Sequence, residues 1–268
     1  MTVHTHDPIQ VATMQNRMKF GALWGNFQQY VCDDVQTSIK RCTCRQFKCL
    51  SNAKFILMHG TTFGLGYGPA RHWTNEFQNF LVEEFCIRKA NIYAPDWGGY
   101  NRETVRRQGG LALAAYLKET MGTKTAQPTV IVGYSHGGSA AISALNNLGS
   151  NRHFYMSNIT LITIATPSRE DYRLNENVSI AQHLNFYNTR DTTQILGVLG
   201  HGGGISTDWR HHPNAENIQI RDYVPYGITN PLGFPVHRAM HRNPGVWTGY
   251  IIPALCSRLC PYNNSKTC

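Results

Sequence analysis

A short apolar segment, 129–132, leads directly into Gly133-Tyr134-Ser135-His136-Gly137-Gly138. Its β-branched residues favour a strand, and small residues follow the glycines at helical spacing, so the sequence predicts a buried strand, a sharp turn and a helix. A G-x-S-x-G turn of this kind exposes the serine hydroxyl in front of a helix N-terminus and needs glycine where a side chain would collide. Ser135 is therefore the candidate nucleophile, although such turns also carry Gly and Ser for conformational reasons alone.

Segments of strand and helix character alternate along the rest of the chain. Apolar runs predict strands at 54–58, 91–94, 158–165, 183–188 and 217–224. Helical periodicity appears at 73–86, at 102–120 and from Ser135 to about 148, and in the second of these Leu111, Ala114, Ala115 and Leu117 are expected to face the core. The alternation favours an α/β fold with a mostly parallel sheet covered by helices on both faces.

The length of 268 residues fits one sizeable α/β domain. We expect a catalytic domain at 54–255, an N-terminal extension at 1–53 that contributes edge strands, and a cysteine-containing tail at 256–268. With 41% apolar and 15% charged residues, the composition is that of a globular enzyme and not of a disordered protein.

Composition also limits the partners that we expect. No apolar run approaches the ~20 residues of a membrane helix, and the N-terminus lacks the basic and apolar regions of a signal peptide. The chain as written is thus expected in the cytoplasm, or outside the cell if its cysteines form disulfides. A net charge of +9 is compatible with peripheral contact to an anionic lipid surface, but the basic residues are too dispersed for nucleic-acid binding to be expected.

Eight cysteines allow three interpretations. They could form disulfides between the two ends of the chain, bind zinc as thiolates, or remain reduced. The Cys42-x-Cys44 pair followed by Cys49 lacks the C-x₂-C spacing of zinc ribbons. We therefore expect neither a metal nor another cofactor.

A glycine-rich loop follows the predicted strand 54–58. It begins His59-Gly60-Thr61 and continues to Gly68 without the Gly-Lys-Ser/Thr ending of a phosphate-binding loop. A glycine-rich loop upstream of a G-x-S-x-G turn can instead supply a backbone N–H to an oxyanion. The second interpretation fits this chain better.

A serine nucleophile needs a general base, and the base needs an acid to orient it. Asp191 follows the predicted strand 183–188 and is a candidate for the acid, or is a simple turn aspartate. Two histidines, His237 and His241, come after the last predicted strand. His237 is preferred as the base because we expect it in the loop after that strand, with His241 as its neighbour one helical turn on.

Several segments together resemble lipase- or esterase-like members of the α/β-hydrolase superfamily, over about residues 54–250. These are 59–61 (HGT), Trp73 with Phe77, 97–101 (WGGYN), 133–138 (GYSHGG), 164–167 (IATP) and 187–191 (YNTRD). The resemblance implies that Ser135 attacks a small-molecule or lipid ester, that His237 takes its proton and that Asp191 orients the imidazole. It further implies that the backbone N–H groups of Thr61 and His136 form the oxyanion hole.

Other functions share this motif set. An amidase, peptidase or thioesterase uses the same catalytic groups, because the fold does not select the acyl bond. A catalytically inactive hydrolase fold could serve as a binding module, and a secreted lipase tied by disulfides would account for the cysteines and the basic charge. The sequence contains no long apolar lid, so a soluble or short-chain ester fits at least as well as a bulk lipid.

Overall fold

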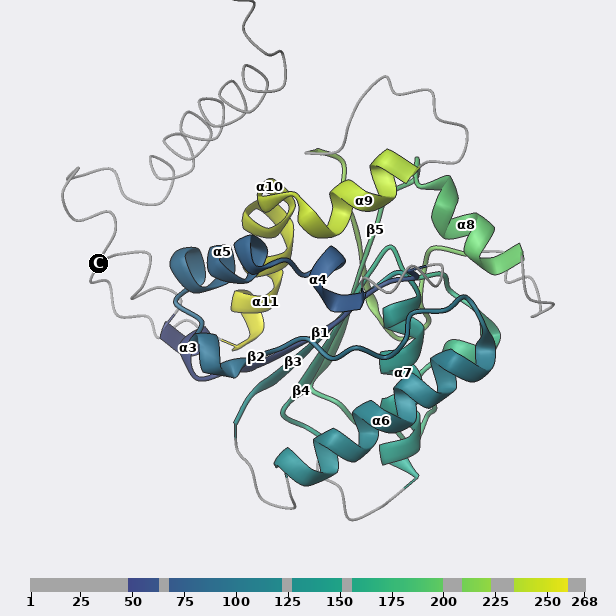
Figure 1. Ribbon diagram of the computed structural model, residues 1–268, viewed down its shortest axis with the longest axis horizontal. Helices are drawn as coiled ribbons and strands as arrows, with labels where there is room; N and C mark the ends of the chain where they lie inside the picture. The colour runs from purple at the N-terminus through teal and green to yellow at the C-terminus, as the bar shows by residue number, and fades with distance from the viewer. Residues whose placement is uncertain are drawn as a thin grey trace, which may run out of the picture. The chain divides into compact units, whose positions relative to one another are not determined.

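Among the described residues, six strands form one sheet in the order β2-β1-β3-β4-β5-β6, and every neighbouring pair is parallel (Figure 1). The computed structural model describes residues 48–62, 68–121, 127–150, 156–199, 209–222 and 234–259. The strands are β1 (Lys54–Met58), β2 (Ile92–Tyr93), β3 (Thr129–Tyr134), β4 (Ile159–Ile164), β5 (Gln182–Tyr187) and β6 (Glu216–Gln219). The predicted α/β class with a parallel sheet is confirmed.

Helices cover both faces of the sheet (Figure 1). One face packs against α6 (Glu103–Met121) and α7 (His136–Gly149), and the other against α5 (Asn75–Phe85), α9 (Phe234–Arg242) and α11 (Ile252–Leu259). The shorter helical segments are α3 (Lys48–Ser51), α4 (Gly68–His72), η1 (Lys89–Asn91), η2 (Glu170–Tyr172), α8 (Thr192–Leu199), α10 (Pro244–Val246) and η3 (Trp247–Ile251).

Strand β1 illustrates how the sequence builds two cores. Phe55 and Leu57 belong to the hydrophobic cluster under α5, α9 and α11, whereas Ile56 and Met58 belong to the cluster under α6 and α7. Successive side chains of a strand point to opposite faces, so a continuous apolar run serves both layers. Burying each such side chain contributes about 1.5–3 kcal/mol relative to leaving it exposed.

The strand order reverses at β1, which lies between β2 and β3. In open α/β sheets, ligands bind beyond the carboxyl ends of the strands at such a switch point. Met58, the last residue of β1, pairs in register with Gly133 of β3. The loop that begins at His59 and the turn at Ser135 therefore leave the sheet side by side.

Two expectations about helices are wrong. Leu111 is 53% exposed and Ala115 is also exposed, because α6 turns another face to its neighbours. That face includes Gly109, which lies against Trp97, and Gly110, which lies against Ser143 of α7. The other error concerns His237, which lies within α9 and not in a loop.

The last strand is shorter than expected, because β6 ends at Gln219 and the expected strand continued to 224. Of that remainder, residues 223 and 224 lie outside the described residues, as do 1–47 of the predicted N-terminal extension and 260–268 of the predicted tail. Cys86 is disulfide-bonded, whereas Cys256 is a half-buried free thiol whose pKa is raised by burial to about 12.

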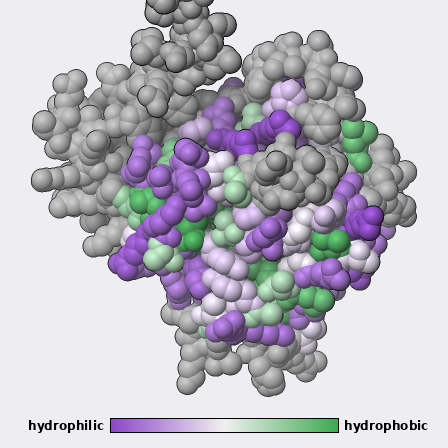
Figure 2. Space-filling model, viewed as in Figure 1, coloured by the Kyte–Doolittle hydropathy of each residue, from purple (hydrophilic) through white to green (hydrophobic). Residues whose placement is uncertain are grey.

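The surface is mixed in character. Figure 2 shows small hydrophobic groups interspersed with hydrophilic ones on the face that it presents. Among the described residues, the large hydrophobic side chains that are exposed are those of Tyr93, Tyr100, Leu111 and Leu196. In the part of the chain that the structure describes, no helix combines the length and the apolar character needed to span a bilayer.

Candidate active site

The turn between β3 and α7 holds Ser135 in an unusual conformation. Its φ of 52° and ψ of −129° lie in a region that L-residues rarely adopt, and its side chain is nearly buried. Such strain persists only where the surroundings enforce it, and it is concentrated at functional sites. Here a β-carbon at Gly133 would collide with the backbone of Gly138, and one at Gly137 with the carbonyl oxygens of Met58 and His59.

Asp191 and His237 form a buried pair. His237 Nδ1 lies 2.7 Å from Asp191 Oδ2, and the Asp191 side chain has no exposed surface. The other carboxylate oxygen, Oδ1, accepts the N–H of Gln194 at 3.0 Å, as an N-cap residue does at the start of α8. Because an ionised carboxylate only accepts hydrogen bonds, Nδ1 carries the imidazole proton and Nε2 is left as an acceptor.

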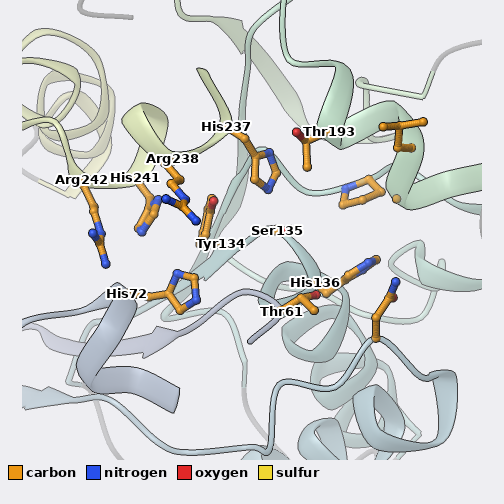
Figure 3. Close-up of a pocket in the computed structure, with 14 residues that line it drawn as sticks. Thr61, His72, Tyr134, Ser135, His136, Thr193, His237, Arg238, His241 and Arg242 are labelled. Atoms are coloured by element: carbon orange, nitrogen blue, oxygen red, sulfur yellow. The ribbon is translucent and has the colours of Figure 1, made fainter. Parts of the chain in front are cut away.

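A cavity of about 280 Å³ lies at the carboxyl ends of β1 and β3. Ser135 and His237 both line it, together with two other sequence-predicted residues, Thr61 and His136 (Figure 3). Asp191 reaches the cavity through His237. The structure thus brings all five predicted residues to one place, although among the described residues no hydrogen bond joins Ser135 Oγ to His237.

The loop after β1 is fixed by the segment that follows β2. Trp97 Nε1–H donates to the carbonyl of His59 at 2.8 Å, and Thr62 N–H donates to the carbonyl of Gly99 at 2.8 Å. Gly99 has a φ of 59°, and a β-carbon there would meet His59 and Thr62. The WGG sequence therefore sets the position of Thr61.

The two residues whose backbone N–H groups the sequence predicts as oxyanion donors, Thr61 and His136, both line the cavity. The N–H of Thr61 donates no hydrogen bond to a described residue. His136 is the first residue of α7, where the positive end of the helix dipole lies. This arrangement can stabilise negative charge on an oxygen near Ser135.

His241, the alternative base, lies on the same helix as His237 but has different surroundings. Its ring stacks on Tyr134 with centroids 3.6 Å apart, and it has no exposed surface. Neither of its ring nitrogens has a hydrogen-bond partner among the residues that the structure describes. Burial, together with the neighbouring His72 and the arginines of α9, holds the pKa of His241 well below its usual range.

Several lining residues were missed at the sequence level. His72 comes from α4, Thr193, Leu196 and Gly197 from α8, and Arg238 and Arg242 from α9. The spacing of Arg238, His241 and Arg242 was the available signal, because positions i, i+3 and i+4 share one face of a helix. His72 gave none, since its place beside Tyr134 depends on tertiary packing.

Within the described residues, no three His, Cys, Asp or Glu side chains are grouped as they would be to hold a metal ion. Three further histidines of the sequence, His201, His211 and His212, fall between Asp191 and the last strand, where a loop or lid is expected. His211 and His212 precede β6 and do not line the cavity, and His201 lies outside the described residues.

No protein-family model matches the chain, and a search of curated proteins finds no match. Among solved structures, the chain is similar to that of an inferred YdeN-like hydrolase from Pectobacterium atrosepticum. The similarity has a TM-score of 0.44 and 14% identity, and it covers 80% of this chain and 95% of the other.

Proposed function

We propose that this protein is a serine hydrolase of the α/β-hydrolase type that cleaves small carboxylic esters through Ser135, His237 and Asp191. The observation that carries the proposal is the buried 2.7 Å contact between His237 and Asp191 beside a serine held at a φ of 52°. A structural turn would need neither the strained serine nor a histidine whose free nitrogen faces the same cavity.

In the proposed reaction, His237 Nε2 removes the Ser135 hydroxyl proton while Oγ bonds to the ester carbonyl carbon. The N–H groups of Thr61 and His136 stabilise the negative charge that develops on the carbonyl oxygen. The imidazolium, held by Asp191, then gives its proton to the departing alcohol, which leaves an acyl-enzyme. Water attacks the acyl carbon with His237 again as the base, and Ser135 recovers its proton as the acid is released.

The size and lining of the cavity support a small substrate. At about 280 Å³ it lies at the lower end of ordinary ligand pockets. Most of the residues that line it carry a polar or charged group, with Pro167 and Leu196 among the exceptions, but apolar atoms make up the larger part of the wall surface. A short acyl chain fits this space better than a long lipid chain.

Hydrolysis of p-nitrophenyl acetate and p-nitrophenyl octanoate tests the proposal. We expect the acetate to be the better substrate and Ser135→Ala to lower kcat by about 10⁴-fold or more. Ser150→Ala, which removes an exposed hydroxyl elsewhere on the protein, is the matched control and should keep full activity. Equal activity of Ser135→Ala and the wild type would refute the proposal, and turnover of amide or thioester analogues alone would redirect it to those bonds.

A further inference from the structure

The wall of the cavity beyond Tyr134 carries chemistry that ester cleavage does not use. Arg238, His241 and Arg242 come from one face of α9 and line the cavity together (Figure 3). We refer to these three residues as the α9 cluster. They lie on the side of Tyr134 away from Thr193 and the start of α8, and both arginines are exposed while His241 is buried.

The buried imidazole of His241 is the first observation that indicates a ligand at this wall. A buried nitrogen without a hydrogen-bond partner costs about 1–3 kcal/mol, and native proteins keep few of them. His241 has two such nitrogens in a side chain with no exposed surface, and its ring lines an open cavity. A ligand group that hydrogen-bonds to the ring would remove this cost.

The charge of the wall indicates the sign of that ligand group. The described residues that line the cavity include two arginines and no Asp or Glu. Arg238 forms no hydrogen bond or ion pair in the described structure. The positive charges of Arg238 and Arg242 act on the buried rings of His241 and Tyr134, and both arginines lower the pKa of each ring.

Tyr134 nevertheless remains a donor. Burial, and then the negative charge of Asp191, raise the pKa of its phenol well above the usual value. Its hydroxyl lies between His237 and the α9 cluster (Figure 3). A protonated phenol, a neutral imidazole and two guanidinium groups together offer hydrogen-bond donors and positive charge, which is the combination that binds an oxyanion.

We propose that the α9 cluster is an anion subsite and that the substrate is an ester carrying a second, negatively charged group, a carboxylate or a phosphate. This inference rests on the proposed hydrolase function and names its substrate class. The scissile carbonyl lies at Ser135, and the charged group extends past Tyr134 to Arg238 and Arg242. The arginines then select the substrate by charge, and His241 fixes the anion from below.

Two matched substrate pairs test the subsite. Mono-p-nitrophenyl glutarate against p-nitrophenyl butyrate places the anion on the acyl side, and 4-acetoxybenzoate against phenyl acetate places it on the alcohol side. We expect kcat/KM for the anionic member of at least one pair to exceed that of the neutral member by about tenfold, mainly through KM. The ratio of kcat/KM between the anionic and the neutral ester should fall toward about one in the double variant Arg238→Gln/Arg242→Gln. It should also fall toward about one for the wild type in 1 M NaCl, where the screening length is only ~3 Å.

Arg107→Gln is the control for removal of a positive charge, because Arg107 is exposed on α6 and pairs with Glu103 away from the cavity. It should leave the ratio unchanged. If neither anionic ester is preferred by the wild type, or if the double variant keeps the preference, the subsite is wrong while the hydrolase function stands.

Ligand binding to Ser135→Ala tests the subsite when the hydrolase function itself is wrong. Calorimetry with monomethyl glutarate and with inorganic phosphate measures the subsite without any chemistry. Binding to Ser135→Ala that is lost in Ser135→Ala/Arg238→Gln would support the anion subsite. If the wild-type protein also hydrolyses no ester, the same result would refute the hydrolase function. If neither probe binds to Ser135→Ala, the anion subsite is overturned.

Discussion

His237 and His241 lie one turn apart on α9, and the two sides of the cavity that they represent are built differently. His237 donates to the buried carboxylate of Asp191, and this carboxylate also caps the N-terminus of α8. The orientation of the His237 imidazole is therefore fixed before any ligand binds. Neither ring nitrogen of His241 has a hydrogen-bond partner in the described part of the chain, and His241 shares its helix face with two exposed arginines. Completed polar networks keep a geometry ready for reaction, whereas incomplete ones retain a cost that a ligand can relieve.

Of the changes that test the difference between the two histidines, Asp191→Asn is expected to have the largest effect, a loss of catalytic activity. The amide can present its NH₂ group to Nδ1, which favours the tautomer with the proton on Nε2 and removes the base. We expect kcat for ester hydrolysis to fall by about 10³–10⁴-fold. Asp222→Asn, which changes an exposed carboxylate bonded to Tyr250, is the control and should have full activity. A loss below tenfold in Asp191→Asn would mean that the carboxylate is only a helix cap.

Replacing His237 should destabilise the protein. His237→Leu leaves the Asp191 carboxylate buried without its imidazole partner, and breaking such a pair costs about 3–5 kcal/mol in free energy of unfolding. Urea denaturation measures this value against the wild type. An unchanged midpoint would show that water or another group replaces the imidazole without cost, and the contrast between the two histidines would lose its energetic basis.

Acid should also destabilise the fold through a third buried histidine. Burial lowers the pKa of His212 to about 4, below the value near 6.5 of an unfolded chain. The unfolded state therefore binds the proton more readily, and stability that is present above pH 6.5 is lost as the pH falls toward 4. The loss is on the order of 3 kcal/mol for this residue.

Thermal unfolding between pH 7.5 and 4 measures this loss. The slope of Tm against pH should be shallower in His212→Gln and unchanged in the neighbouring control His211→Gln. Parallel slopes for His212→Gln and the wild type would contradict the assignment.

The smallest effect is expected from His241→Leu, and it has the opposite sign to that of His237→Leu. Leucine has a similar size and no polar atoms, so the change removes two unsatisfied nitrogens. We expect a gain of about 1 kcal/mol, which corresponds to a rise in Tm of roughly 2–4 °C for a domain of this size. A decrease in Tm would show that the His241 imidazole has hydrogen-bond partners in solution. The observation that supports the anion subsite would then be lost.

Much of the fold could be predicted because its signals are local. The apolar run at 54–58 became β1 with the same bounds, and the strand, turn and helix around Ser135 were found where expected. The orientation of α6 could not be predicted from periodicity alone. Its face is chosen by the close approach that Gly109 and Gly110 permit, and this leaves Leu111 exposed.

In the candidate site, too, local sequence signals could be predicted and features that depend on tertiary packing could not. Motif order and spacing predicted the residues around Ser135, but His237 was expected in the loop after the last predicted strand. It lies within α9 instead, where Pro235 is tolerated because it stands in the first helical turn. The α9 cluster was not predicted, since its significance depends on which face of α9 meets the cavity. His72 reaches Tyr134 through tertiary contact that no local pattern encodes.

The most direct test of the central claim is covalent labelling with a fluorophosphonate, followed by mass spectrometry of the peptide that contains Ser135. We predict a single adduct on Ser135 in the wild type, none in Ser135→Ala, and strongly slowed labelling in Asp191→Asn. A folded wild-type protein that remains unlabelled, or an adduct on another residue, would contradict the proposal that this strained turn is a catalytic nucleophile.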